Sequence, residues 1–138
     1  MKHWLVKSEP VKWGWEQMVK AKRTHWDGVR NHAASNNLKA MKLGDEAFFY
    51  HSQEGLEIVG IVEIVREYYP DPSDESGRFG MVDVQASRPL KTFVTLKQMK
   101  ADPALSGLVL IRQGRLSVSP VSDAEWTHIC KLGGVDPK

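Results

Sequence analysis

The 138-residue sequence contains one cysteine, Cys130, which excludes an internal disulfide and a metal cluster built from thiolates. A single cysteine fits a reducing compartment, so we expect a cytoplasmic location. The first residues hold only a short apolar stretch before Lys7, which is neither a signal peptide nor a membrane span. Walker, nucleophile-elbow and H-E-x-x-H motifs are missing, and the five histidines lack metal-ligand spacing. We therefore expect no metal, no cofactor and no membrane partner.

Net charge is also small, because 19 Lys and Arg oppose 17 Asp and Glu and leave +2. The distribution is uneven. Residues 1–43 hold nine basic and three acidic residues, whereas residues 44–138 hold ten and 14. A basic N-terminal third is what a surface facing phosphates would need. In many chains, however, a dividing point can be chosen that gives two parts of unequal charge. The charge pattern alone therefore leaves the nucleic-acid hypothesis open.

Hydrophobic residues make up 41% and charged residues 26%, which is typical of one folded domain, here residues 1–138. The predicted strands cover residues 4–8, 46–52, 57–67 and 79–86, and predicted helices lie near 12–20 and over 31–41. Capping boxes at Thr95 and Ser122 predict two more helices. Residues 108–111 form either a buried strand or a helical segment. This order predicts an α+β fold, a small barrel-like sheet with helices around its ends.

Particular residues add detail to this fold. Gly60 lies inside a β-branched run and marks a bulge or a close backbone approach. Trp4, Trp15 and Trp126 fit amphipathic patterns and are predicted to be core residues, while Trp13 has no assignment. Cys130 falls on the inward face of the last helix, so we expect an inert core thiol.

Several strings occur in an order that is itself informative. They are Trp-Leu-Val-Lys-Ser-Glu-Pro at 4–10, Trp-Asp-Gly-Val-Arg-Asn at 26–31, Asn-Asn-Leu-Lys-Ala-Met-Lys-Leu-Gly-Asp at 36–45, Phe-Tyr-His-Ser at 49–52, Gly-Ile-Val-Glu at 60–63, Arg-Glu-Tyr-Tyr-Pro-Asp at 66–71 and Gly-Arg-Leu-Ser-Val-Ser-Pro-Val at 114–121. With these strings the sequence resembles the EVE domain over about residues 2–133. It is similar to stand-alone bacterial EVE proteins and to the thymocyte nuclear protein group.

The resemblance implies a PUA-like mixed β-barrel, related to YTH and ASCH domains. It implies a non-enzymatic module that binds DNA or RNA and takes one modified base, such as a methylated cytosine, into an aromatic-lined pocket. Two departures bear on base specificity: the loop over 72–79 is shorter than is usual in the family, and Phe79 stands where a tryptophan is expected.

The base-pocket candidates combine a flat aromatic wall with polar groups for the base edge. Trp26 is the first choice for the wall because it lies in a polar segment, with a plug at one end of the barrel as the alternative. Lys7 and Ser8 end the first strand, and Ser8 either donates to a base or caps the next helix. Asn31 offers a donor and an acceptor to a base edge, or is a helix N-cap.

Further rim candidates are Tyr50, His51 and Ser52 at the end of a strand. Because side chains alternate along a strand, Tyr50 and His51 point to opposite faces, and the sequence leaves open which of them faces the pocket.

The candidates for phosphate contact are cationic side chains. Arg30 either binds a phosphate or stacks its planar guanidinium on a base. Arg115 either binds the phosphate backbone of the nucleic acid or is a surface arginine with no partner. Lys39 and Lys42 fit an electrostatic footprint, or simply a solvated helix face.

Two other classes of function compete with a base reader. Lys7, Glu9, His51 and Glu63 would make an acid–base cluster if they met at one barrel mouth, and ASCH relatives suggest a small hydrolase of modified nucleosides or RNA. A protein-interaction adaptor would instead show a large exposed apolar patch.

Overall fold

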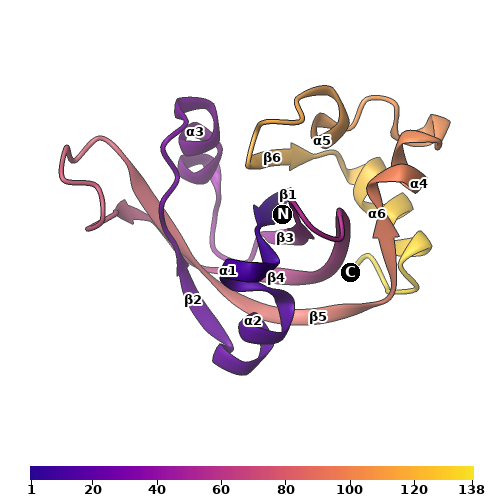
Figure 1. Cartoon of the computed structure of the whole chain (residues 1–138), viewed down its shortest axis with the longest axis horizontal. Helices are drawn as coiled ribbons and strands as arrows, with labels where there is room; N and C mark the ends of the chain where they lie inside the picture. The colour runs from indigo at the N-terminus through magenta and orange to yellow at the C-terminus, as the bar shows by residue number, and fades with distance from the viewer.

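A six-stranded mixed sheet dominates the computed structural model, which describes all residues, 1–138 (Figure 1). The strands are β1 (His3–Ser8), β2 (Arg23–Trp26), β3 (Glu46–His51), β4 (Glu57–Pro70), β5 (Gly80–Thr95) and β6 (Val118–Val121). The helices are α1 (Pro10–Trp13), α2 (Trp15–Ala21), α3 (His32–Ala40), α4 (Leu96–Lys100), the 3₁₀ turn η1 (Pro103–Leu105), α5 (Val109–Arg112) and α6 (Asp123–Leu132). The α+β prediction, with helices around a small curved sheet, is confirmed.

The strand order is β2-β5-β4-β3-β1-β6, and only the β1–β3 pair is parallel. The long hairpin of β4 and β5 curves through the molecule, from the side of α3 to the side of α4 and α6 (Figure 1). Its register shifts four times, for example between Ile58 and Gly60 and between Ile64 and Arg66. Because each bulge bends and twists a strand, these shifts produce the curvature.

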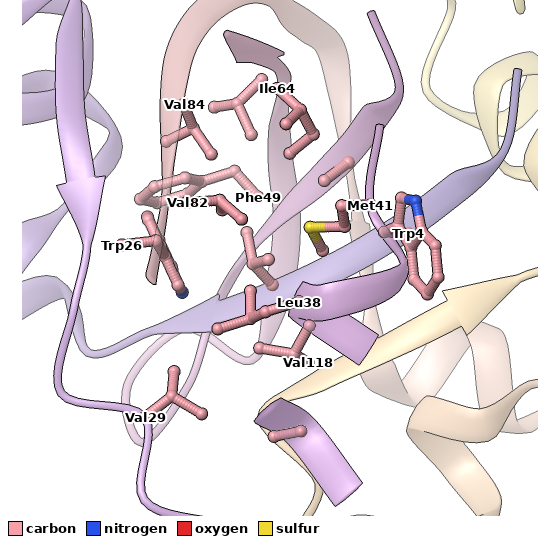
Figure 2. Close-up of a cluster of buried hydrophobic side chains, with 14 of the residues drawn as sticks. Trp4, Trp26, Val29, Leu38, Met41, Phe49, Ile64, Val82, Val84 and Val118 are labelled. Atoms are coloured by element: carbon pink, nitrogen blue, oxygen red, sulfur yellow. The ribbon is translucent and has the colours of Figure 1, made fainter. Parts of the chain in front are cut away.

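Hydrophobic side chains fill both faces of the central strands. Trp4 and Phe49 belong to one buried cluster with Leu38 of α3, whereas Leu5 and Phe48 belong to a second with Trp126 of α6. Successive residues of a strand point to opposite faces, so β1 and β3 read as continuous apolar runs. The first cluster, shown in Figure 2, reaches the end of β2 and backs the site described below.

Gly60 is confirmed as a place of close approach. A Cβ atom there would lie 2.6 Å from Cε2 of Trp15, and the β3–β4 and β4–β5 registers shift beside it. Trp4 and Trp126 are core residues as predicted, with 3% and 1% of their surface exposed. Trp15 is only partly buried and covers Gly60 from outside, with its ring 5.4 Å from that of Phe49. Cys130 is buried, and burial raises the pKa of its thiol to about 11.

Three local predictions were wrong. The segment 23–26, predicted as a polar loop, is strand β2 because its backbone pairs with that of residues 82–85 in β5. The helix predicted over 12–20 is two helices, α1 and α2, separated at Gly14, whose backbone is extended. The strands β4 and β5 run on to Pro70 and Thr95, well beyond their predicted ends. The open question at 108–111 is decided in favour of a helix, α5. No helix has the length and apolar character that crossing a membrane requires.

Candidate nucleic-acid interface

A polar cavity of about 510 Å³ opens where β1 ends, beside α1 and the segment that connects β2 to α3. Its lining residues are Lys7, Ser8, Glu9, Lys12, Trp13, Thr24, His25, Trp26, Asp27, Gly28, Val29, Arg30, Asn31 and Ser117. Ligand sites in proteins commonly have volumes of about 300–1,000 Å³, so the cavity is large enough for a nucleobase with its sugar. Five of the predicted site residues meet here: Lys7, Ser8, Trp26, Arg30 and Asn31.

Two tryptophans contribute aromatic surface to the cavity. Trp26 ends β2, keeps 9% of its surface exposed, and packs edge-on against Phe49 with the ring centroids 5.7 Å apart (Figure 2). It therefore joins the core and lines the cavity at once, and its role as the stacking wall stays a prediction. Trp13 of α1 is half-buried, and its indole N–H donates to the sulfur of Met18 at 3.5 Å. Sequence reasoning missed Trp13, since its place in the cavity depends on how α1 folds back beside β1.

Lys7 and Ser8 reach the cavity from the end of β1. The ammonium Nζ of Lys7 donates to the carbonyl of Gly114 at 2.6 Å, and burial lowers the pKa of Lys7 below its ordinary 10.5. The hydroxyl of Ser8 donates to the carbonyl of Trp13. Ser8 thus holds the C-terminal end of α1 and is not the helix N-cap, which is Glu9. Its contact with a base stays a prediction, and its oxygen can still accept a hydrogen bond.

Asn31 is the N-cap of α3 and also lines the cavity. Its side-chain oxygen accepts from the backbone N–H of Ala34 at 3.0 Å, while the NH₂ group makes no hydrogen bond within the protein. Arg30 is differently engaged. Its Nη1 donates to Asp71 and its Nη2 to the hydroxyl of Ser73, at 3.1 and 2.9 Å. The guanidinium expected to hold a phosphate is instead paired with a buried carboxylate.

Tyr50, His51 and Ser52 do not line the cavity. Tyr50 is 2% exposed in the second core cluster, where burial raises its pKa. His51 accepts from the backbone N–H of Trp15 at 3.1 Å, and burial lowers the pKa of its ring. Ser52 follows β3, and its backbone N–H bonds to the carbonyl of Ser8. Tyr50 and His51 pair with Lys7 and Ser8 along the sheet, and the ring of Tyr50 lies under the Lys7 ammonium at 6.0 Å without itself lining the cavity.

The other predicted cations lie outside the cavity. Arg115 is exposed and lines an adjoining hollow of about 330 Å³, which shares Asn31 with the first cavity. Lys39 sits 5.5 Å above the ring of Tyr68, and Lys42 lines a separate hollow near the N-terminus. Of these, only Arg115 adjoins the cavity.

The acid–base cluster considered for a hydrolase is not assembled. Lys7 and Glu9 both line the cavity, but Glu9 pairs with Lys12 at 3.3 Å. Glu63 is exposed on β4 opposite Glu46, and His51 faces Trp15. No group of three or more His, Cys, Asp or Glu side chains is placed to hold a metal ion. The cavity offers hydrogen-bonding groups and aromatic surface.

The description "EVE domain" belongs to the family model that matches residues 2–132, so the chain is a member of the EVE domain family of PUA-like proteins. It is 37% identical over 169 residues to human "Thymocyte nuclear protein 1", with 98% of this chain and 75% of the relative covered. The structure of Rpa0253 from Rhodopseudomonas palustris is 54% identical, with a TM-score of 0.92 over 97% of this chain and 94% of that one. The structure of human THYN1 protein in complex with 5-methylcytosine-containing DNA is 38% identical, with a TM-score of 0.89 and coverage of 99% and 100%.

Proposed function

We propose that this protein is a non-enzymatic reader that binds nucleic acid and holds one modified base, of the methylated-cytosine type, in the cavity beside Trp26. The observation that carries the proposal is the cavity itself, which combines two tryptophans with free polar groups where β1 and β2 end. Kinship with human THYN1, whose structure contains 5-methylcytosine DNA, supports this choice of ligand.

The lining residues match the two chemical parts of a base. Stacking on an aromatic side chain contributes about 1–3 kcal/mol per base, and Trp26 or Trp13 supplies that surface. The edge of cytosine presents an amino donor beside acceptor atoms. The carboxylates of Glu9 and Asp27 are acceptors, and the NH₂ of Asn31 and the ammonium of Lys7 are donors.

The phosphates beside the base need cations near the cavity mouth. Lys12 lines the cavity, and Arg115 lines the adjoining hollow on the far side of Asn31. Lys39 and Lys42 are exposed farther along α3 and after it, where they would act on the backbone at longer range. Because such contacts release counterions, the affinity should fall as salt rises.

The test is direct binding to matched oligonucleotides in DNA and RNA that carry a single cytosine, 5-methylcytosine or 5-hydroxymethylcytosine. Burying one methyl group contributes about 0.8 kcal/mol, which predicts an about fourfold preference for 5-methylcytosine. Anisotropy at two salt concentrations measures both the preference and the salt dependence. Lys7→Gln should weaken binding, whereas Lys100→Gln, on α4 and away from the cavity, should not. Equal binding to all three bases, or no binding to any oligonucleotide, would contradict the proposal.

A further inference from the structure

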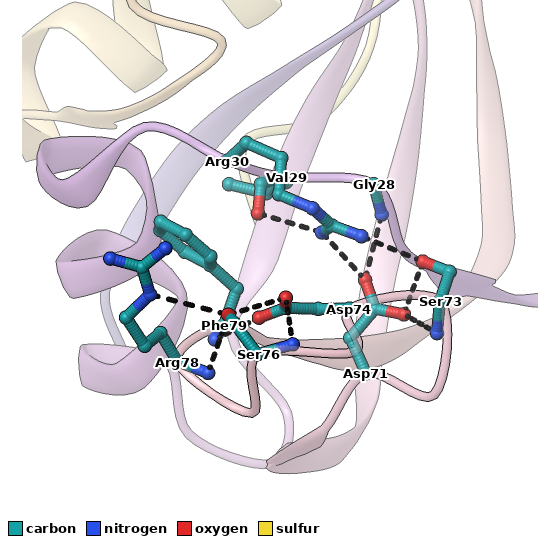
Figure 3. A network of polar contacts seen from close by, with 9 residues as sticks. All are labelled: Gly28, Val29, Arg30, Asp71, Ser73, Asp74, Ser76, Arg78 and Phe79. Atoms are coloured by element: carbon teal, nitrogen blue, oxygen red, sulfur yellow. Dashed lines mark hydrogen bonds and ion pairs between the residues drawn. The ribbon is translucent and has the colours of Figure 1, made fainter.

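The loop between β4 and β5, residues 71–79, contacts the wall of the cavity from behind. Asp71 is the central residue of this contact, as Figure 3 shows. Its side chain has no exposed surface. Its Oδ2 atom accepts from the backbone N–H of Gly28 at 2.9 Å and from Nη1 of Arg30 at 3.1 Å. Its Oδ1 atom accepts from the backbone N–H and the hydroxyl of Ser73, at 2.8 and 2.6 Å. One carboxylate therefore joins the loop to the cavity wall.

The wall needs such an anchor because it has no regular structure of its own. Residues 27–31 lie between the end of β2 and the start of α3, outside any helix or strand. They contain Asp27 and Asn31, the polar groups offered to a base edge, and they follow Trp26 directly. Gly28 has a φ of 78°, and its N–H bonds to Asp71 rather than to a neighbouring strand. The position of this segment thus depends on a residue 43 positions farther along the chain.

The contact is extended by aromatic packing. Phe79, at the end of the same loop, lies 5.8 Å from the guanidinium of Arg30 and 5.0 Å from the ring of His32. Burial acts to raise the pKa of Asp71, but the hydrogen bonds from Ser73, Gly28 and Arg30 outweigh it together and lower the pKa to about 2, so the carboxylate is ionised at neutral pH. Arg30 is held between the buried carboxylate of Asp71 and the ring of Phe79, so its side chain supports the cavity wall. The residues of the loop itself do not line the cavity.

We propose that Asp71 is a positioning residue for the base cavity, and that the β4–β5 loop sets the preference for a modified base through the segment 27–31. This inference rests on the proposed function. A second carboxylate of the loop provides the contrast. The carboxylate of Asp74 accepts hydrogen bonds only within the loop, from Ser76 and from the backbone N–H of Phe79. If the loop acts through Asp71, loss of the charge at Asp71 should alter binding and loss of the charge at Asp74 should not.

The experiment compares Asp71→Asn with Asp74→Asn in the whole protein. Affinities are measured for matched oligonucleotides with cytosine or 5-methylcytosine, and NMR hydrogen exchange reports the amide of Gly28. We expect Asp71→Asn to bind the methylated oligonucleotide about tenfold more weakly, equivalent to about 1.4 kcal/mol, because the charge-assisted hydrogen bonds that hold the cavity wall are weakened. The ratio between the two bases should fall towards one, and the Gly28 amide should exchange faster. Asp74→Asn should keep the wild-type ratio and the wild-type Gly28 exchange.

The outcomes separate the two proposals. An Asp71→Asn protein that stays folded, exchanges Gly28 faster and yet keeps the wild-type affinity and ratio would overturn the positioning role alone. Equal losses of affinity in both variants would also overturn it, because the loss would then follow from any damage to the loop. Wild-type protein that binds neither oligonucleotide would overturn the reader proposal and the positioning role with it. Should Asp71→Asn fail to fold, Arg30→Lys keeps the charge but loses the two-branched contact to Asp71 and Ser73, and the same reduction of the ratio is expected.

Discussion

Replacing Trp26 with alanine is expected to weaken the fold and the binding of a base by separate amounts. The side chain is 91% buried and packs against Phe49, so its removal leaves a void in the first core cluster. Such large-to-small changes cost about 3–5 kcal/mol of unfolding free energy. Domains have about 5–15 kcal/mol in total, so the variant should remain folded at low temperature with a lower denaturation midpoint. Loss of the stacking surface should cost another 1–3 kcal/mol of binding, or about fivefold to 150-fold in affinity.

The assay measures the two effects on the same samples. Urea unfolding followed by circular dichroism gives the stability, and anisotropy with a 5-methylcytosine oligonucleotide gives the affinity under conditions where the variant is folded. Leu38→Ala is the matched control, because Leu38 is fully buried in the same cluster but does not line the cavity. It should lose about 2–5 kcal/mol of stability and keep its affinity.

One pattern of results would refute this reasoning. If Trp26→Ala and Leu38→Ala lose similar stability and both keep the wild-type affinity, Trp26 is a core residue only. The aromatic wall would then have to be Trp13, which is half-buried and lines the cavity from α1. A large loss of affinity in Leu38→Ala would show instead that binding follows global stability.

Two further predictions concern stability. Gly60→Ala should cost about 1–3 kcal/mol by overpacking, because its Cβ would lie 2.6 Å from Cε2 of Trp15. Gly107→Ala, where the nearest atom is 3.8 Å away, should change the urea midpoint little, and equal effects would contradict the close approach. The carboxyl pKa of Asp71 is lowered from 3.8 to about 2, so its contribution to stability is present above about pH 4 and disappears as the pH falls through 2. The thermal unfolding midpoint of Asp71→Asn should therefore lie below that of the wild type at pH 6 and approach it at pH 2. A difference in midpoint that stays constant with pH would contradict the lowered pKa of Asp71.

Much of the local structure was predictable because its causes lie close together in the sequence. The capping box at Ser122 forms as expected, with the hydroxyl accepting from the N–H of Glu125 at 3.2 Å and the Glu125 carboxylate accepting from the N–H of Ser122 at 2.9 Å. Alternation placed the central strands, and the ordered strings indicated the family to which the chain belongs. Lys7, Trp26 and Asn31 were chosen from these strings, and the structure brings them to one cavity.

What the sequence could not supply depends on partners far along the chain. Strand β2 has a polar sequence. It forms because the backbone N–H and C=O groups of β5, about 60 residues later, pair with its own. Alternation along β3 holds, since Tyr50 lies with Phe48 in the second core cluster and the His51 ring lies 5.7 Å from that of Phe49, but only the packing of α1 and α2 around the sheet shows that neither side chain lines the cavity.

The amino-acid sequence is enough to predict the fold class, the family and the residue types available for a base, which are aromatic surface, amide, carboxylate and ammonium. Which of these residues face one cavity depends on the folded chain, where Arg30, a predicted phosphate contact, pairs with Asp71, 41 residues away. The physical reason is that a buried carboxylate must be paired, and the nearest cation and free N–H groups are known only once the chain has folded.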